Sequence, residues 1–173
     1  MVFLNQLEKT GEQLGKAVSA SRDGGMDILD KLKQEHEEVD GLLKQLVATG
    51  TGAARKSLVK KIKAALIPHV RAEQKVVYDA IIALKNKDAK VDGNEGYIEH
   101  RLAEKVLLSL DKLGSGSPEF AASCKVLKEL VEHHVEEEER NVWKDVRENF
   151  SDEQRVAMCK KFEAAKKKVR IPS

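Results

Sequence analysis

Residues 66–82 read LIPHVRAEQKVVYDAII, and residues 131–147 read VEHHVEEEERNVWKDVR. Aligned on their histidines, the two stretches share His-x-x-x-Glu within matching apolar surroundings: His69 and Glu73 in the first, His134 and Glu138 in the second. Four residues along an α-helix make about one turn and about 6 Å of rise, so imidazole and carboxylate project from the same face. One such pair arises easily by chance, whereas two copies in matching surroundings indicate a repeated structural unit.

The repeat extends to both halves of the chain. Glu35-His36 and Glu99-His100 precede the two motif histidines by 33 and 34 residues. The chain therefore reads as one helical hairpin used twice. Such pseudo-symmetry would place two equivalent half-sites against each other across a core.

The composition favours an all-α fold. Of 173 residues, 41% are hydrophobic and 35% charged, with only three prolines, which suits amphipathic helices around a narrow core. Apolar residues recur at helical spacing over five stretches: 27–48, 53–86, 95–113, 118–149 and 151–168. Short connections between the first four predict an antiparallel up-and-down four-helix bundle, followed by a short extra C-terminal helix.

Turn and capping residues set the limits of these elements. Residues 87–94 are read as a polar loop that ends in Asp-Gly-Asn. Ser117-Pro118 is a strong helix start, and a capping box begins at Ser151. Pro68 is expected to kink or split the second helix, because it removes one backbone donor and crowds the preceding turn.

Three segments follow from this reading: an N-terminal extension over 1–25, the bundle over 26–150, and a C-terminal helix and tail over 151–173. The extension has a weak apolar stripe broken by glycines. It fits a helix lying over the bundle, and an arm that docks a partner protein is no better supported.

Several classes of function are excluded at this stage. The net charge of +2 is too small to indicate nucleic-acid binding, and no stretch approaches the roughly 20 apolar residues that span a bilayer. The N-terminus lacks the pattern of a signal peptide, so a cytoplasmic location is expected. Cys124 and Cys159 are read as buried thiols in a reducing compartment.

Four of the five histidines fall on the inward stripes of four different helices. Burying that much imidazole and carboxylate without partners would cost several kcal/mol per group. Metal ions are the simplest partners that satisfy all of them together. His133 aligns with Pro68 in the repeat, so it is placed on the flank rather than among the ligands.

Further carboxylates remain open as ligands. Glu137 is an alternative to Glu138, because it lies three residues from its histidine. Asp40 and Glu104 each follow a histidine by four residues, and the longer side chain of Glu104 reaches further toward a metal on the bundle axis.

Other site types fit less well. The chain has no His-Glu-x-x-His for a zinc protease, and no Cys-x-x-Cys for structural zinc or an iron–sulfur cluster. No histidine has the glutamate three residues before it that a ferritin-like di-iron site needs.

The spaced set over residues 27–148 resembles the hemerythrin-like, or HHE cation-binding, domain. This resemblance implies an antiparallel four-helix bundle around two iron ions joined by an oxo or hydroxo bridge. Glu73 and Glu138 would bridge the irons, and the four histidines would be terminal ligands. The full set of expected metal ligands is His36, His69, Glu73, His100, Glu104, His134 and Glu138.

Two departures from many hemerythrins bear on the chemistry. This chain has Glu104 where they carry a second histidine on the third helix, and His-x-x-x-Glu where their last motif is His-x-x-x-x-Asp. If Glu104 binds, one coordination position stays open; if it does not, two do. A carboxylate beside iron would favour the ferric state, which suits peroxide decomposition or oxidant sensing better than reversible oxygen carriage.

The resemblance implies a protein that binds or turns over a small oxidant such as O2, H2O2 or NO. An enzymatic version would be catalase-like or peroxidase-like, and whether the protein is an enzyme stays open. A non-enzymatic iron or oxygen binding, storage or sensing protein is the alternative, and a metal-free interaction bundle is a third. Tyr78 and Trp143 occupy equivalent places after each motif, as core aromatics that close one end of the bundle, as donors to the ligands or as a gate for the oxidant.

Overall fold

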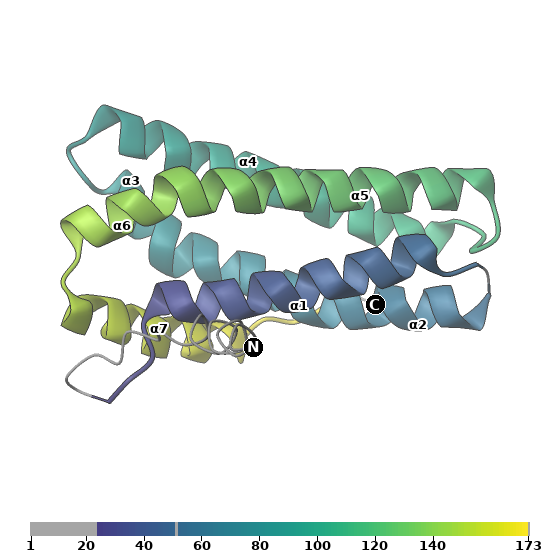
Figure 1. Ribbon diagram of the computed structural model, residues 1–173, viewed down its shortest axis with the longest axis horizontal. Coiled ribbons are helices and arrows are strands. Elements are labelled where there is room, and N and C mark those ends of the chain that lie inside the picture. The colour runs from purple at the N-terminus through teal and green to yellow at the C-terminus, as the bar shows by residue number, and fades with distance from the viewer. Residues whose placement is uncertain (1–23, 51, 173) are drawn as a thin grey trace, which may run out of the picture.

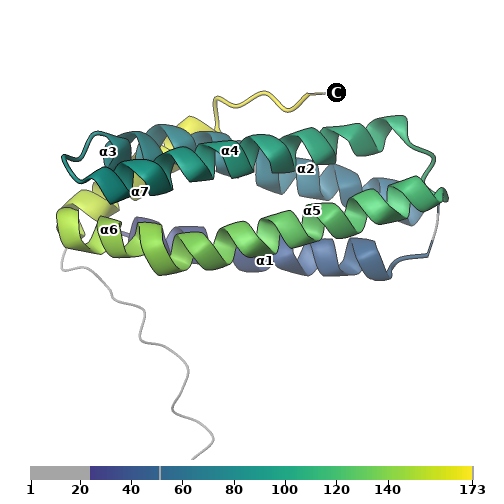
Figure 2. The ribbon, with the colours of Figure 1, turned by 90° about the horizontal axis from the view of Figure 1, so that it is seen from above.

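The computed structural model describes residues 24–50 and 52–172. Four long helices lie lengthwise and antiparallel (Figure 1): α1 (Ile28–Ala48), α2 (Ala53–Glu73), α4 (Lys87–Ser109) and α5 (Pro118–Glu137). In one view α1 lies beside α2 and α4 beside α5, and after a 90° turn α1 lies beside α5 (Figure 2). The predicted all-α, up-and-down bundle is confirmed.

Shorter segments extend this frame. The second helix continues through a π-helical turn, η1 (Gln74–Tyr78), into α3 (Asp79–Ile82), and the fourth through η3 (Glu138–Val142) into α6 (Trp143–Asn149). A 3-10 turn, η2 (Leu110–Lys112), ends the third helix. The extra C-terminal helix, α7 (Asp152–Lys166), packs against α1 and α2. None of the described helices has the length and apolar character that a bilayer crossing requires.

Side-chain caps fix where the helices begin. The Asp27 carboxylate accepts from the backbone N–H of Leu29 at the start of α1, and its second oxygen accepts from Arg155 of α7 at 2.7 Å. Ser117 caps α5 immediately before its proline, and Ser151 forms the predicted capping box. These contacts satisfy backbone donors that a helix start leaves without partners.

The expected loop over 87–94 is wrong, because α4 already begins at Lys87. Asn86 caps that helix by accepting from two backbone N–H groups. Gly93 and Gly96 serve close packing rather than a turn. A Cβ added at Gly93 would lie 2.8 Å from a side-chain carbon of Ile82. One added at Gly96 would lie 2.5 Å from the ring of Tyr78.

The expected interruption at Pro68 is also misplaced. Pro68 lies inside α2, which continues as a regular helix to Glu73. The departure from α-helical geometry comes directly afterwards, in η1, and the equivalent stretch of the second copy contains η3. Single π-helical turns inside α-helices occur frequently at functional sites.

Two apolar clusters fill the interior. The first lies toward the turn between α1 and α2 and includes Leu43, Ile62 and Leu127. The second lies toward α6 and α7 and includes Leu32 and Phe162. The predicted buried free thiols are confirmed, with Cys124 in the first cluster and Cys159 in the second. Residues 1–23 of the extension expected over 1–25 lie outside the described residues.

The substitution Gly96→Ala tests the packing of α4 against Tyr78. The added methyl would overlap the phenol ring, and we expect a net loss of about 1–2 kcal/mol in the free energy of unfolding after a helix-propensity gain of about 1 kcal/mol. Gly41→Ala is the matched control, since a Cβ there meets nothing within 4 Å inside α1. That control should gain about 0.5–1 kcal/mol in denaturant unfolding. Equal effects of both substitutions would contradict the packing role.

Candidate metal centre

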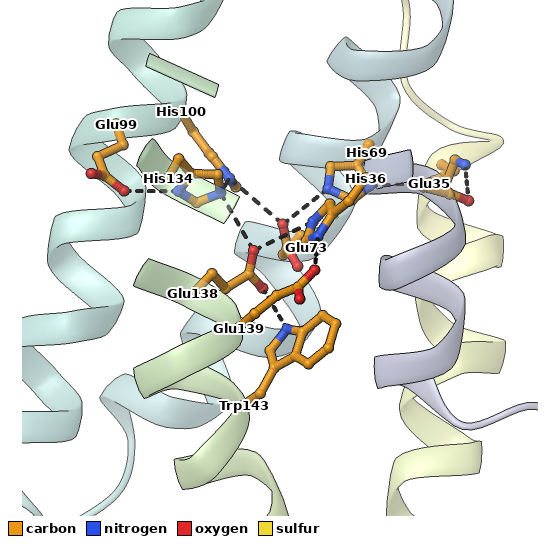
Figure 3. A network of polar contacts seen from close by, with 11 residues as sticks. Glu35, His36, His69, Glu73, Glu99, His100, His134, Glu138, Glu139 and Trp143 are labelled. Atoms are coloured by element: carbon orange, nitrogen blue, oxygen red, sulfur yellow. Dashed lines mark hydrogen bonds and ion pairs between the residues drawn. The ribbon is translucent and has the colours of Figure 1, made fainter. Parts of the chain in front are cut away.

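The structure brings four histidines together in the middle of the bundle, one from each long helix (Figure 3). They lie between the two apolar clusters, and none is more than 7% exposed: His36, His69, His100 and His134. Helical periodicity explains the convergence, since each lies on the buried stripe of its own helix. His133 is 62% exposed in its side chain and lies on the flank, as the repeat predicts.

Two carboxylates lie between histidines of different halves. Glu73 Oε2 is 3.3 Å from Nε2 of His69 on its own helix and 3.6 Å from Nε2 of His100 on α4. Glu138 Oε2 repeats the pattern, at 3.4 Å from Nε2 of His134 and 3.5 Å from Nε2 of His36 on α1. Each carboxylate therefore connects the two half-sites.

Two groups of potential ligand atoms result, and they share one residue. His36, His69 and Glu73 form one group, and Glu73, His100 and His134 form the other. Within each group the ligand atoms lie within 4.8 Å of one another. Nitrogen and oxygen donors at such separations could hold a pair of neighbouring cations, with Glu73 between them.

Several polar atoms of this cluster have unmet hydrogen-bonding capacity. His36 Nε2, Glu138 Oε2 and both carboxylate oxygens of Glu73 are buried without a hydrogen-bond partner among the described residues. Buried polar groups are normally paired, and leaving one unpaired costs about 1–3 kcal/mol. Because these atoms point at a common space, cations would satisfy them together. The residues present therefore fit a metal centre.

In the metal-free cluster, the histidines and glutamates differ in how strongly they bind protons. Burial, followed by the charge of Glu138, raises the pKa of Glu73 well above its ordinary value. Burial opposes ionisation of His134, but its close contact with the Glu138 carboxylate and its hydrogen bond to Glu99 outweigh burial and raise the pKa of His134 to about 10. Burial and the charge of His134 lower the pKa of His100. Bound cations would displace these protons, so cation binding is linked to proton release.

Three further carboxylates hold the outer nitrogens of the histidines. The Nδ1–H of His69 donates to Glu35 at 3.1 Å, and that of His134 donates to Glu99 at 2.7 Å. Glu139 lies 3.3 Å from Nδ1 of His36. These contacts leave Nε2 facing the centre, which is how carboxylates orient metal-binding histidines.

Sequence reasoning missed the role of Glu35 and Glu99. Both were visible as part of the repeat, immediately before a histidine, but their partners lie on other helices, 34 and 35 residues away. The repeated Glu-His pair was the available signal.

The C-terminal helix supports one of these contacts. Lys166 of α7 donates to Glu35 at 2.6 Å, and Lys31 lies 3.0 Å from the same oxygen. Burial opposes ionisation of Glu35, but its bonds with His69 and Lys166 outweigh this and lower its pKa to about 2. The ring of Phe162 packs edge-on against His69 at 5.8 Å between centroids. Helix α7 therefore packs directly behind this half-site.

The structure does not bring Glu104 into the cluster. Its carboxylate forms an ion pair with Arg71, whose guanidinium lies across from it on α2. Asp40 pairs with Lys44 at 2.7 Å, and Glu137 pairs with Arg140. Spacing along the helix, four residues for Glu104 and Asp40 and three for Glu137, did not reveal that basic residues hold these carboxylates in ion pairs.

The two aromatic residues after the motifs contact the cluster differently. The indole N–H of Trp143 donates to Glu138 Oε1 at 3.3 Å, and its ring stacks on His36 at 6.0 Å between centroids. Tyr78 is fully buried, with its ring centroid 5.2 Å from that of His100. Its hydroxyl has no partner among the described residues. Both are core aromatics, and Trp143 is also a donor to a candidate ligand.

A narrow pocket adjoins the four histidines on the side of the first apolar cluster. Its remaining walls are mostly aliphatic and include Val39, Leu66 and Val131. It has space for about one water-sized molecule. A small uncharged molecule could therefore lie beside the cluster in apolar surroundings.

The sequence pattern of the hemerythrin HHE cation-binding domain matches residues 27–144, about two-thirds of the chain. The chain belongs to the hemerythrin HHE cation-binding family. The match contains every histidine and glutamate of the cluster described above. It ends before α7, so Lys166 and Phe162 lie outside the part of this HHE protein that the family pattern describes.

Two similar proteins were found. The crystal structure of a hemerythrin HHE cation-binding domain-containing protein from Mycobacterium kansasii matches with a TM-score of 0.69 at 23% identity. The match covers 82% of this chain and 86% of that one, and it shows a shared fold. A protein named DNA nickase from Nostoc sp. is 27% identical over 157 residues. That alignment covers 90% of this chain but only 44% of the relative.

Glu35→Gln tests whether the outer carboxylate supports metal binding. Loss of the charged acceptor for His69 should lower the affinity for a divalent cation by about 10- to 100-fold, the usual effect of removing such a partner. Competition titration of the metal-free protein with Co2+ against a chromophoric chelator measures this. Glu37→Gln, an exposed position on the same helix, should leave the affinity unchanged.

Glu104→Ala tests the ligand set. Because Glu104 is paired with Arg71, we expect its removal to leave metal stoichiometry and optical spectrum unchanged. A loss of bound metal or a shifted spectrum would show instead that Glu104 turns inward when the site is loaded. Circular dichroism would confirm that the variant keeps its helical content.

Proposed function

We propose that this HHE protein holds two iron ions at the bundle centre and binds or turns over a small oxidant there. The proposed ligands are the four converging histidines and the two carboxylates between them: His36, His69, Glu73, His100, His134 and Glu138. The observation that carries the proposal is the placement of one oxygen of each carboxylate, Oε2 of Glu73 and of Glu138, within 3.6 Å of histidine nitrogens from both halves.

The donor set supports iron. Imidazole and carboxylate ligands suit iron, zinc and manganese, so donor chemistry alone leaves these metals open. A pair of adjacent positions with shared carboxylates, in a chain of the hemerythrin family, favours iron among them. When bound, the two ions would supply the redox chemistry.

The protein surroundings suit a small ligand. The aliphatic pocket beside the histidines has space for about one water-sized molecule, which favours ligands as small as O2, NO or H2O2 over larger substrates. Because Glu104 pairs with Arg71, it is not counted among the metal ligands. One more coordination position on the metal would then be open to a small ligand. The chain's own part is to hold the metal ligands in place and to exclude bulk water.

The position of Glu104 also changes the expected chemistry. The expectation that the site favours ferric iron rested on that carboxylate beside the metal. With Glu104 held by Arg71, that argument no longer separates oxidant turnover from reversible binding or sensing. We therefore keep both proposals, catalase-like or peroxidase-like activity and non-enzymatic oxidant binding. An assay of H2O2 turnover distinguishes them.

Other expectations from the sequence stay predictions. They include the absence of nucleic-acid binding, the cytoplasmic location, and the division into residues 1–25, 26–150 and 151–173. The name of the Nostoc relative gives a reason to test DNA binding directly, although this chain spans less than half of that protein.

Elemental analysis of protein purified without added metal tests the proposal. We expect about two irons per chain, charge-transfer absorption in the near-ultraviolet and visible range, and changes in that absorption on adding H2O2 or NO. Oxygen release from H2O2 with the iron retained would indicate turnover. Changes without release would indicate binding or sensing.

His100→Ala should lower the iron content sharply, whereas His133→Ala is the matched control and should keep it. The proposal would be contradicted if the wild-type protein contained no iron as purified and bound none after anaerobic reconstitution with Fe2+.

A further inference from the structure

A crevice leads from the protein surface to the metal centre between α4 and the segment formed by α5 and η3. These two elements lie side by side along the bundle (Figure 1). The crevice reaches His134 and Glu138, two of the proposed ligands. Its lining includes surface residues as well as these ligands, and it lies on the side of the cluster opposite to Glu35 and α7, as the placement of Glu99 and Glu35 in Figure 3 shows.

Acidic side chains surround the crevice. Asp92 and Glu95 of α4 lie on its rim, together with Glu99 and Glu137. No lysine or arginine is among its lining residues, and Arg140, which pairs with the lining residue Glu137, is 62% exposed. Burial, followed by the charges of Asp88 and Glu137, raises the pKa of Asp92. The rim therefore has a negative field that would attract cations.

The inner end of the crevice has polar atoms without partners. The Tyr78 hydroxyl is fully buried and has no hydrogen-bond partner among the described residues. Glu138 Oε2 is likewise without a hydrogen bond. An oxygen-lined passage of this kind offers a hydrated cation replacement ligands as it loses water.

Gly96 and Tyr78 pack closely against each other in the wall of the crevice. A Cβ at Gly96 would lie 2.8 Å from the Tyr78 hydroxyl, so a larger residue would displace that group. The crevice has space for about one water-sized molecule, enough for a divalent cation that has lost most of its hydration shell.

The corresponding face of the other half is closed. There Lys31 and Lys166 neutralise Glu35, and α7 packs over α1 and α2. In the repeat, Lys31 corresponds to Glu95, so the charge at this position is reversed between the halves. The two otherwise similar half-sites thus differ in their access to cations.

We propose that this acidic crevice is the route by which divalent cations reach the metal centre. The proposal rests on the metal-binding function proposed above. In it, Asp92 and Glu95 collect the cation at the surface, and the Tyr78 hydroxyl lies beside its path to His134 and Glu138. The crevice affects the rate of loading, whereas the ligands determine the final occupancy.

The double substitution Asp92→Asn/Glu95→Gln tests this route, since neither residue is a proposed ligand. Stopped-flow absorption would follow Co2+ binding to the metal-free full chain at low and high ionic strength. We expect association to slow by about 10-fold at low ionic strength, with the difference shrinking in salt, because steering by charge is screened. Final stoichiometry should match the wild type.

Glu38→Gln/Glu129→Gln is the matched control, because it removes two exposed charges from α1 and α5 away from the crevice. It should load at the wild-type rate. Glu95→Lys provides a second, single-site variant at an exposed position and should also slow loading. Wild-type rates in both crevice variants, or equal slowing in the control, would overturn the route. A wild-type chain that takes up no Co2+ or Fe2+ would instead refute the metal-binding function itself.

Discussion

The structure depends on one constraint: four imidazoles and two carboxylates share a buried space in which several of their polar atoms have no hydrogen-bond partner among the described residues. Apolar clusters on both sides keep that space away from water. Each helix must be placed so that its histidine reaches the same region. The caps, the close approach at Gly96 and the packing of α7 all serve this placement.

Periodicity was sufficient to predict which face each histidine occupies, because helical spacing alone fixes that face. It could not predict partners across helices. Glu104 has the same spacing from its histidine as Glu73 and Glu138 have from theirs, yet Arg71 on a neighbouring helix holds it in an ion pair. The local sequence was also misleading at Asp92-Gly93-Asn94, a turn-like tripeptide that lies inside α4. Gly93 allows the side chain of Ile82 to pack closely against that helix.

The two halves are alike at the ligands and different around them. Glu35 and Glu99 hold equivalent histidines, but lysines surround only the first. His36 has Glu139 beside its outer nitrogen, whereas the outer nitrogen of His100 has no partner among the described residues. Repetition thus provides the ligand geometry, and the unrepeated residues give each half-site its own charge and access.

The π-helical turns have a consequence for how the aromatic residues are positioned. At about 100° per residue, a regular α-helix would place Tyr78 about 140° around the axis from Glu73, away from the cluster. One extra residue accommodated in η1 reduces that angle to about 40°, and η3 does the same for Trp143 relative to Glu138. A single-residue deletion in either turn would therefore restore a regular α-helix and leave the aromatic ring four residues after the glutamate, still about 40° around the axis from it.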